Sequence, residues 1–174
     1  MGGLNWYTIF NMEGEKFRIE KNESIEKIKP QGIIAGTPGI GKTTLIDNFS
    51  TSDISVLDLD SSPYRKDQTW PDNYLKKIEE EMRQNNLLLI SSYPEIVKEL
   101  TARGYEVTVV CADENLQDEY RKRYISRGNK PEMVERFIDA SFASNKEQTD
   151  RFEGSNVVFL QTGQYLSDII DLPE

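Results

Sequence analysis

The chain has 174 residues, of which 37% are hydrophobic, so it is long and apolar enough to bury one core of ordinary size. Acidic residues outnumber basic ones by 30 to 21, and the net charge of -9 disfavours a membrane surface or an extended nucleic-acid track as partner. The chain lacks histidine, a signal-peptide pattern and any apolar stretch of about 18 residues, so we expect a single-domain cytoplasmic protein without histidine catalysis or histidine metal ligands.

Residues 1–30 are expected to form an N-terminal extension to the domain formed by residues 31–174. Two short runs with strand-like composition, residues 6–10 and 16–20, flank a polar Asn-Met-Glu-Gly stretch that is typical of a turn. This pattern predicts a β-hairpin that covers the core or extends its edge. Because such a strand can pair within one chain or across two, both a monomer and a homodimer stay open.

Residues 36–43 read Gly-Thr-Pro-Gly-Ile-Gly-Lys-Thr and match every fixed position of the phosphate-binding pattern G-x-x-x-x-G-K-[ST]. An apolar run precedes them and an amphipathic stretch follows, as expected for a strand, a loop and a helix. Glycines let backbone N–H groups surround a phosphate, Lys42 can reach the β and γ phosphates, and the Thr43 hydroxyl can bind Mg²⁺. The sequence therefore predicts a site for ATP and Mg²⁺, formed by Gly36, Thr37, Pro38, Gly39, Ile40, Gly41, Lys42, Thr43 and Thr44.

Five apolar, mostly β-branched runs are separated by stretches with helical periodicity. The runs are residues 33–35, 54–59, 87–90, 107–110 and 157–160. Helices are expected at residues 71–84 and 94–100, after Asp113, from Pro131 onward and, as a short closing helix, at residues 163–172. The alternation predicts an α/β fold in which a parallel sheet is covered by helices on both faces, with ligands at the carboxyl ends of the strands. Cys111 follows the fourth run and is expected to be a small buried hydrophobic residue.

Two carboxylates end the second run, which reads Val-Leu-Asp-Leu-Asp. Asp58 and Asp60 point to the same face, because side chains alternate along a strand. We expect Asp58 to hold Mg²⁺ through a bound water, and Asp60 to accept a hydrogen bond from the substrate hydroxyl that attacks the γ-phosphorus. The alternative is that both acids are solvated and cap the following turn.

The basic segment after the fourth run, residues 119–131, contains Arg123 and Arg127. Residues four apart share one face of a helix, and the Gly-Asn-Lys-Pro stretch that follows would end this helix in a small lid. Two guanidinium groups on a lid suit phosphoryl transfer, because charge spreads over the equatorial oxygens of the transferring group. The alternative is a solvated basic face paired with nearby acids.

The phosphate loop, the Asp58-x-Asp60 pair and the Arg123-x-x-x-Arg127 arrangement resemble the small nucleoside and nucleotide kinases, the P-loop superfamily that includes adenylate, shikimate and gluconate kinases. The compact size is similar to that of phage-encoded nucleotide kinases. Over residues 31–172 the resemblance implies a three-layer P-loop fold with a five-stranded sheet of order 2-3-1-4-5 and a short lid. It also implies that Lys42, Arg123 and Arg127 stabilise the transferring phosphoryl group, while Thr43 and Asp58 bind Mg²⁺.

The segment after the third run departs from this family. Nucleoside monophosphate kinases usually carry an Asp-Gly-x-Pro-Arg type segment there, whereas this chain has Ser-Ser-Tyr-Pro at residues 91–94. Ser91 could still bind a phosphate or a metal-bound water. Three aromatic residues could line a base site, although burial in the core is the simpler interpretation: Tyr64, Trp70 and Tyr93. Two basic residues beyond the acid pair suit a substrate phosphate or an exposed loop: Arg65 and Lys66.

The sequence thus predicts an ATP- and Mg²⁺-dependent phosphotransferase that transfers the γ-phosphoryl group to a small acceptor, foremost a (deoxy)nucleoside monophosphate. A non-nucleotide hydroxyl, or the end or a base of a polynucleotide, is an alternative acceptor. A nucleotide-binding switch or regulatory ATPase is an alternative of a different class. It is disfavoured because neither Asp58-Leu59-Asp60 nor Leu89-Ile90-Ser91 contains the Asp-Glu pair usual for such proteins.

Overall fold

A computed structural model of the chain describes residues 6–10, 16–20, 27–48, 55–85 and 87–171. Its main sheet has five parallel strands, in the spatial order β4, β5, β3, β6, β7. They are β3 (Gly32–Gly36), β4 (Val56–Leu59), β5 (Leu87–Ser91), β6 (Val107–Ala112) and β7 (Asn156–Leu160). Counted in chain order within this sheet, the strands lie 2-3-1-4-5, which confirms the predicted topology.

Two further strands near the N-terminus form a separate antiparallel pair. They are β1 (Trp6–Phe10) and β2 (Lys16–Glu20), in the two ranges where the sequence predicts short strands. Their register places Trp6 opposite Glu20 and Phe10 opposite Lys16. The Asn-Met-Glu-Gly turn predicted between them lies outside the described residues.

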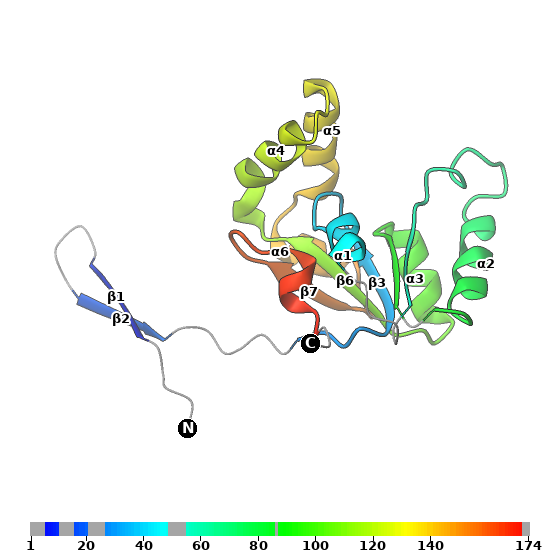
Figure 1. Cartoon of the computed structure of the whole chain (residues 1–174), viewed down its shortest axis with the longest axis horizontal. Helices are drawn as coiled ribbons and strands as arrows, with labels where there is room; N and C mark the ends of the chain where they lie inside the picture. Colours follow the sequence, from blue (N-terminus) through cyan, green and yellow to red (C-terminus); the bar gives the residue numbers. More distant parts are fainter. Residues whose placement is uncertain (1–5, 11–15, 21–26, 49–54, 86, 172–174) are drawn as a thin grey trace.

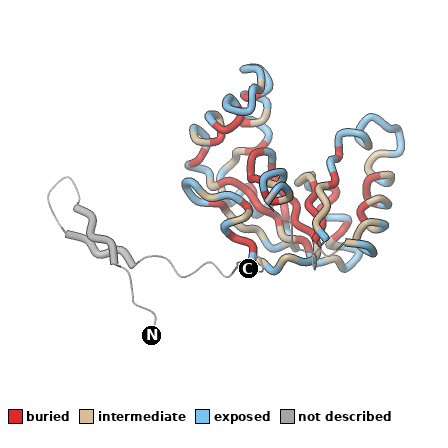
Figure 2. Tube along the Cα trace, viewed as in Figure 1, coloured by how far each residue is buried: buried red, intermediate tan, exposed pale blue. Residues whose placement is uncertain are grey.

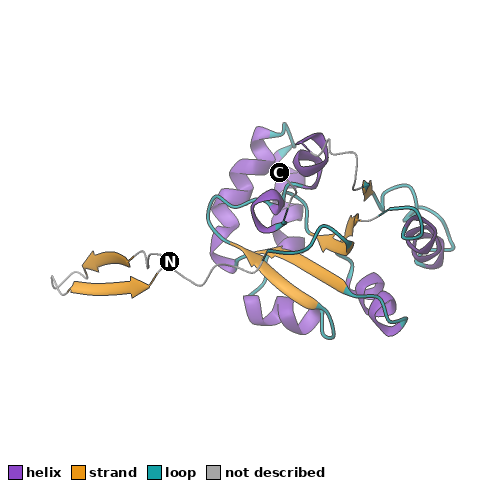
Figure 3. Cartoon of the chain, turned by 60° about the horizontal axis from the view of Figure 1, so that its bottom comes forward, coloured by secondary structure: helices purple, strands orange, loops and turns teal. Residues whose placement is uncertain are grey.

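Helices cover both faces of the main sheet, so the domain has three layers (Figures 1 and 3). They are α1 (Lys42–Asn48), α2 (Asp72–Glu81), α3 (Pro94–Ala102), the 3-10 turn η1 (Glu114–Leu116), α4 (Gln117–Ser126), α5 (Pro131–Ser141), α6 (Asn145–Arg151) and α7 (Leu166–Ile169). In the part of the chain that the structure describes, none of them has the length and apolar character that a membrane crossing requires.

Two of these helices differ from the sequence prediction. The predicted closing helix at residues 163–172 is shorter, because residues 161–164 form a turn, closed by the Gln164 N–H donating to the Gln161 carbonyl at 2.9 Å, and the helix begins only at α7. The sequence reasoning also missed α6, a short polar helix without an apolar stripe. Its signal was a capping box, in which the Ser144 side chain accepts from the Glu147 backbone and the Glu147 carboxylate accepts from the Ser144 backbone.

The hydrophobic core is divided by the sheet into two layers. Buried residues are concentrated along the strands of the main sheet and on the parts of the helices that pack against it (Figure 2). Alternate strand residues serve the two sides, as Ile33 and Ile34 illustrate. One layer packs the sheet against α1, α4, α5 and α7, and the other packs it against α2 and α3. Cys111 is buried in the second layer, where burial raises its pKa to about 12 and keeps the thiol protonated.

One buried side chain fixes the carboxyl ends of two strands. Tyr74 of α2 is fully buried, and its hydroxyl donates to the Leu59 carbonyl at 2.7 Å and accepts from the Ser91 N–H at 3.4 Å. Leu59 ends β4 and Ser91 ends β5. The Tyr74 hydroxyl therefore holds together the points at which β4 and β5 end and their following loops begin.

Replacing Tyr74 with Phe should lower the free energy of unfolding by about 1–3 kcal/mol, because two buried backbone groups lose their partner. Urea unfolding of the two proteins measures the difference. Tyr105→Phe is a matched control, since Tyr105 is half-buried and its hydroxyl makes no hydrogen bond within the described residues. If Tyr74→Phe changed the free energy of unfolding by less than about 0.5 kcal/mol, no more than the control, the anchoring role of Tyr74 would be contradicted.

Candidate active site

The P-loop, residues 36–43, connects β3 to α1 at the carboxyl edge of the sheet. Its conformation requires glycine at three positions. A Cβ at Gly36 would lie 2.0 Å from the Ile40 side chain, and a Cβ at Gly39 would lie 2.9 Å from the Tyr124 ring. Gly39 and Gly41 also have positive φ angles, +85° and +102°. The loop thus has the tight form that the sequence pattern predicts.

Lys42 begins α1, and its ammonium group bends back over the loop. Nζ donates to the Gly36 carbonyl at 2.9 Å and approaches the Thr37 carbonyl at 3.4 Å. Burial lowers the pKa of Lys42, Arg127 lowers it further, and the carboxylates of Asp58 and Asp60 oppose this effect. Four predicted site residues are therefore close enough to influence one another. Thr43 and Thr44, the next residues of the helix, are exposed.

The two acids after β4 have different surroundings. Asp58 is half-buried, so burial raises its pKa, while Lys42 lowers it and Asp60 adds to the increase. Asp60 is exposed, and its Oδ1 accepts from the Ser62 N–H at 3.0 Å and from the Ser62 hydroxyl at 2.9 Å. One oxygen of Asp60 thus caps the following turn, as the alternative interpretation of this pair states.

The residues predicted to contact substrate lie beside these acids. Ser91 shares a 3.0 Å hydrogen bond with Ser61 through their hydroxyl groups. Arg65 donates to the Tyr93 hydroxyl at 2.8 Å, and its guanidinium lies 4.9 Å from the centre of the Tyr93 ring. Lys66 is exposed and lines neither of the cavities described below.

The three aromatic residues considered for a base site belong to a chain of ring contacts that runs through Tyr74. The ring centres of Trp70 and Tyr74 are 5.5 Å apart, and those of Tyr64 and Tyr74 are 5.3 Å apart. Trp70 also meets Tyr93 edge to face at 5.3 Å. These contacts secure the segment of residues 60–71. Packing explains Tyr64 and Trp70, which line neither of the cavities described below, whereas Tyr93 also lines the larger cavity, as predicted for a residue that contacts substrate.

Two cavities open at the P-loop. The larger, of about 730 Å³, lies between the P-loop, the end of β5 and α5, and its polar lining includes Lys42, Arg65, Ser91 and Arg136. The smaller, of about 380 Å³, is lined by Pro38, Gly39, Gly41, Lys42, Thr43, Tyr124, Arg127, Asn129 and Phe137. Lys42, Pro38 and Phe137 line both. The lysine therefore lies where the two spaces meet.

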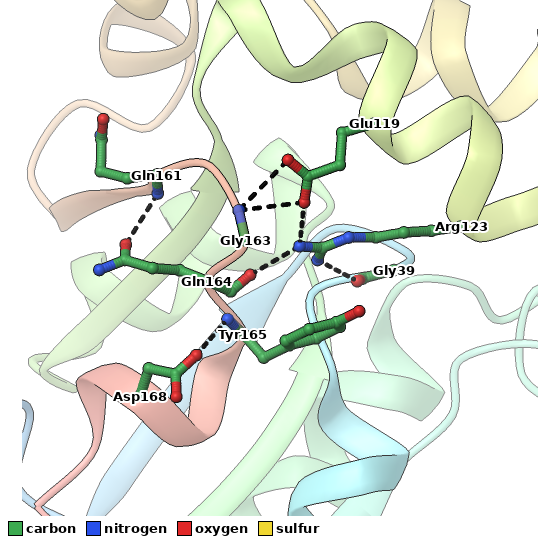
Figure 4. Close-up of polar contacts among 8 residues, drawn as sticks. All are labelled: Gly39, Glu119, Arg123, Gln161, Gly163, Gln164, Tyr165 and Asp168. Carbon is green, nitrogen blue, oxygen red and sulfur yellow. Dashed lines mark hydrogen bonds and ion pairs between the residues drawn. The ribbon is translucent and has the colours of Figure 1, made fainter.

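Arg123, on α4, and Arg127, the residue that follows α4, do not share an environment. Arg127 is exposed and lines the smaller cavity. Arg123 is only 9% exposed and lines neither cavity. Its guanidinium is paired with Glu119 and donates to the carbonyl groups of Gly39 at 3.3 Å and Gln164 at 2.9 Å (Figure 4). Of the two arginines predicted on the lid, the structure brings only Arg127 to the cavities.

Arg136 is a candidate site residue that the sequence reasoning missed. It lies on α5 and lines the larger cavity together with Met133, Phe137 and Ala140. These residues follow the i, i+3, i+4, i+7 spacing of one helix face. That spacing was the available signal, although the sequence does not show that this face borders the P-loop.

No protein-family model matches the chain, and a search of curated proteins gave no match. The resemblance to small kinases therefore rests on the residues of the site.

Replacing Lys42 with Met should raise the free energy of unfolding of the ligand-free protein by about 1 kcal/mol at pH 7, because a desolvated cation is removed. Because the pKa of Lys42 is lower in the folded protein than in the unfolded chain, the unfolded chain binds more protons than the folded protein just below about pH 10.5. Stability therefore increases with pH in that range. Wild-type stability should therefore recover as pH rises, and the advantage of the variant should shrink between pH 7 and pH 10.

Urea unfolding at several pH values measures this difference. Lys98→Met is the control, since Lys98 is exposed on α3. An equal or lower stability of Lys42→Met at pH 7 would mean that attraction to Asp58 outweighs the desolvation of the ammonium group.

Proposed function

We propose that the protein is an ATP- and Mg²⁺-dependent phosphotransferase of the P-loop kinase superfamily, with a (deoxy)nucleoside monophosphate as acceptor. The observation that carries this proposal is the position of Lys42 in the wall common to two cavities. One cavity has the P-loop glycines, Thr43 and Arg127, which suit the phosphates of a donor nucleotide. The other offers separate space for an acceptor. A cytoplasmic location, where ATP is present, fits this activity.

The residues of the smaller cavity suit the donor side of the reaction. Lys42 would contact the β and γ phosphates once its ammonium group leaves the Gly36 carbonyl, and the exposed Arg127 is free to approach them. Thr43 and Asp58 would hold Mg²⁺, which prefers oxygen ligands and neutralises phosphate charge when bound. The half-buried carboxylate of Asp58, close enough to Lys42 to shift its pKa, fits that role.

The larger cavity suits an anionic acceptor. Arg65 and Arg136 place two guanidinium groups in its lining, and planar guanidinium donors match the oxygens of a phosphate group. An oxygen of the acceptor phosphate would form a bond to the γ-phosphorus while the bond to the bridging oxygen breaks, and ADP leaves with that electron pair. A monophosphate oxygen is already ionised near pH 7, so no proton has to be removed.

The kinase of a non-nucleotide hydroxyl is a second candidate, favoured by the Asp58-x-Asp60 pair. A hydroxyl acceptor must lose its proton, and the exposed Asp60 carboxylate has one oxygen outside its contact with Ser62 that could accept it. A polynucleotide end would place the same demand on Asp60. A switch or regulatory ATPase would need no second cavity of about 730 Å³ beside the P-loop.

ADP production from Mg·ATP should rise strongly in the presence of a nucleoside monophosphate and stay low without one. A panel of monophosphates, nucleosides, sugars, hydroxy acids and 5′-hydroxyl oligonucleotides tests this. Lys42→Ala should abolish the stimulated rate while the circular dichroism spectrum stays unchanged. Full turnover in Lys42→Ala would refute the role of the P-loop, whereas ATP binding without stimulation by any acceptor would favour the switch.

Arg136→Ala should raise the KM for a monophosphate acceptor about tenfold or more, because a charged donor to phosphate is lost, and should leave the KM for ATP unchanged. Steady-state kinetics with each substrate varied in turn measures both constants. Arg151→Ala is the control, since Arg151 is exposed at the end of α6 and lines neither cavity. An unchanged KM for the acceptor in Arg136→Ala would remove this residue from the acceptor site.

A further inference from the structure

We propose that Arg123 positions the P-loop instead of binding phosphate, and that Glu119 is the carboxylate that holds Arg123 in this position. The proposal rests on the nucleotide site proposed above, and it assigns to Glu119 a role in that site. It also separates Arg123 from Arg127, which the sequence pattern treats as a pair.

The guanidinium group of Arg123 already donates to three acceptors. Nη1 donates to the Gly39 carbonyl, and Nη2 donates to the Gln164 carbonyl and is paired with the Glu119 carboxylate. Tyrosine rings lie near it as well, with Tyr165 at 4.0 Å and Tyr120 at 4.6 Å from ring centre to Cζ. To reach a phosphate, Arg123 would have to leave three hydrogen-bond acceptors and two aromatic contacts together.

These contacts join three segments that are distant in the sequence. Arg123 and Glu119 come from α4, Gly39 comes from the P-loop, and Gln164 comes from residues 161–165, the loop between β7 and α7 (Figure 4). Both oxygens of Glu119 also accept from the Gly163 N–H, each at 3.2 Å. Arg123 and Glu119 together therefore fasten the β7–α7 loop to the P-loop.

Holding a carbonyl oxygen fixes the direction of an amide. In a trans peptide the C=O and the following N–H point to opposite sides, so the contact from Arg123 to the Gly39 oxygen also directs the Ile40 N–H. The next peptide is held in the same way, because the Leu166 N–H donates to the Ile40 carbonyl at 2.8 Å and so directs the Gly41 N–H. Two successive P-loop amides are thus oriented from the β7–α7 side.

The packing around the loop glycines supports the same conclusion. A Cβ at Gly41 would lie 3.2 Å from the Tyr165 ring, and one at Gly39 would lie 3.2 Å from the Tyr120 ring. The two rings that contact the Arg123 guanidinium therefore also border the two glycines with positive φ. If Arg123 moved, the space next to both glycines would change.

Neutralising Glu119 distinguishes the two possible roles of Arg123 by the sign of the effect. If Arg123 positions the P-loop, Glu119→Gln should weaken Mg·ATP and Mg·ADP by the same factor of about ten, because the β-phosphate cradle is common to both nucleotides. If Arg123 bound phosphate directly, Glu119→Gln would remove its competing anion and would tighten ATP. Isothermal titration calorimetry with each nucleotide measures the two affinities.

Hydrogen exchange gives a second readout that does not depend on nucleotide. The amides of Gly163 and Leu166 should exchange faster in Glu119→Gln than in the wild-type protein, because both belong to the fastened loop. If Glu119→Gln did not fold, Arg123→Lys would serve instead, since one ammonium group cannot replace the planar fork. Arg103→Lys is the control, because Arg103 pairs with Glu79 and Glu99 at the surface.

Tighter ATP binding in Glu119→Gln, or exchange at Gly163 and Leu166 equal to that of the wild-type protein, would overturn the positioning role. Wild-type protein that bound neither nucleotide would overturn the proposed nucleotide site instead. In that event the exchange rates of Gly163 and Leu166 alone would decide whether Arg123 and Glu119 fasten the loop.

Discussion

The desolvation of the Lys42 ammonium group is the constraint on which the site depends. The amine is removed from most of the solvent, and among the described residues it is compensated by the carbonyl groups of Gly36 and Thr37 and by the field of Asp58 and Asp60. Such a cation is poorly satisfied, because neutral carbonyls replace hydration incompletely. An anion that entered either cavity would supply the missing charge. In the proposed function, part of the free energy lost by burying the cation would be regained when an anion binds where both cavities meet.

The fold was predictable because it is encoded locally. The apolar runs at residues 33–35, 54–59, 87–90 and 107–110 predict parallel strands, and the glycine-rich loop after the first of them predicts where ligands approach. The different roles of Arg123 and Arg127 were not predictable. The orientation of the Arg123 guanidinium is set by hydrogen bonds to the carbonyl groups of Gly39 and Gln164, which are 84 and 41 residues away along the chain. Helical spacing cannot reveal such contacts.

The same limit explains the other residues that sequence reasoning missed or left open. Arg136 lines the larger cavity because α4 and α5 contact each other and lie on one side of the P-loop, opposite the segment of residues 60–71 (Figure 1). Tyr93 likewise contacts Arg65, which belongs to that segment. The walls of the larger cavity are thus formed by residues that are distant in the sequence, whereas its floor, the P-loop, is one continuous segment. For the proposed phosphotransferase, acceptor specificity would therefore lie in the part of the site that motifs describe least.

The burial of Cys111 also gives the protein a practical property. Its thiol is the only one in the chain, and it is both inaccessible and held in the protonated form. A cysteine introduced at an exposed position, such as Met133 beside the larger cavity, would be the sole reactive sulfur. The chain can therefore carry a single fluorescent or spin label without removal of a competing thiol, and the emission or mobility of a label at residue 133 would report changes in the surroundings of α5.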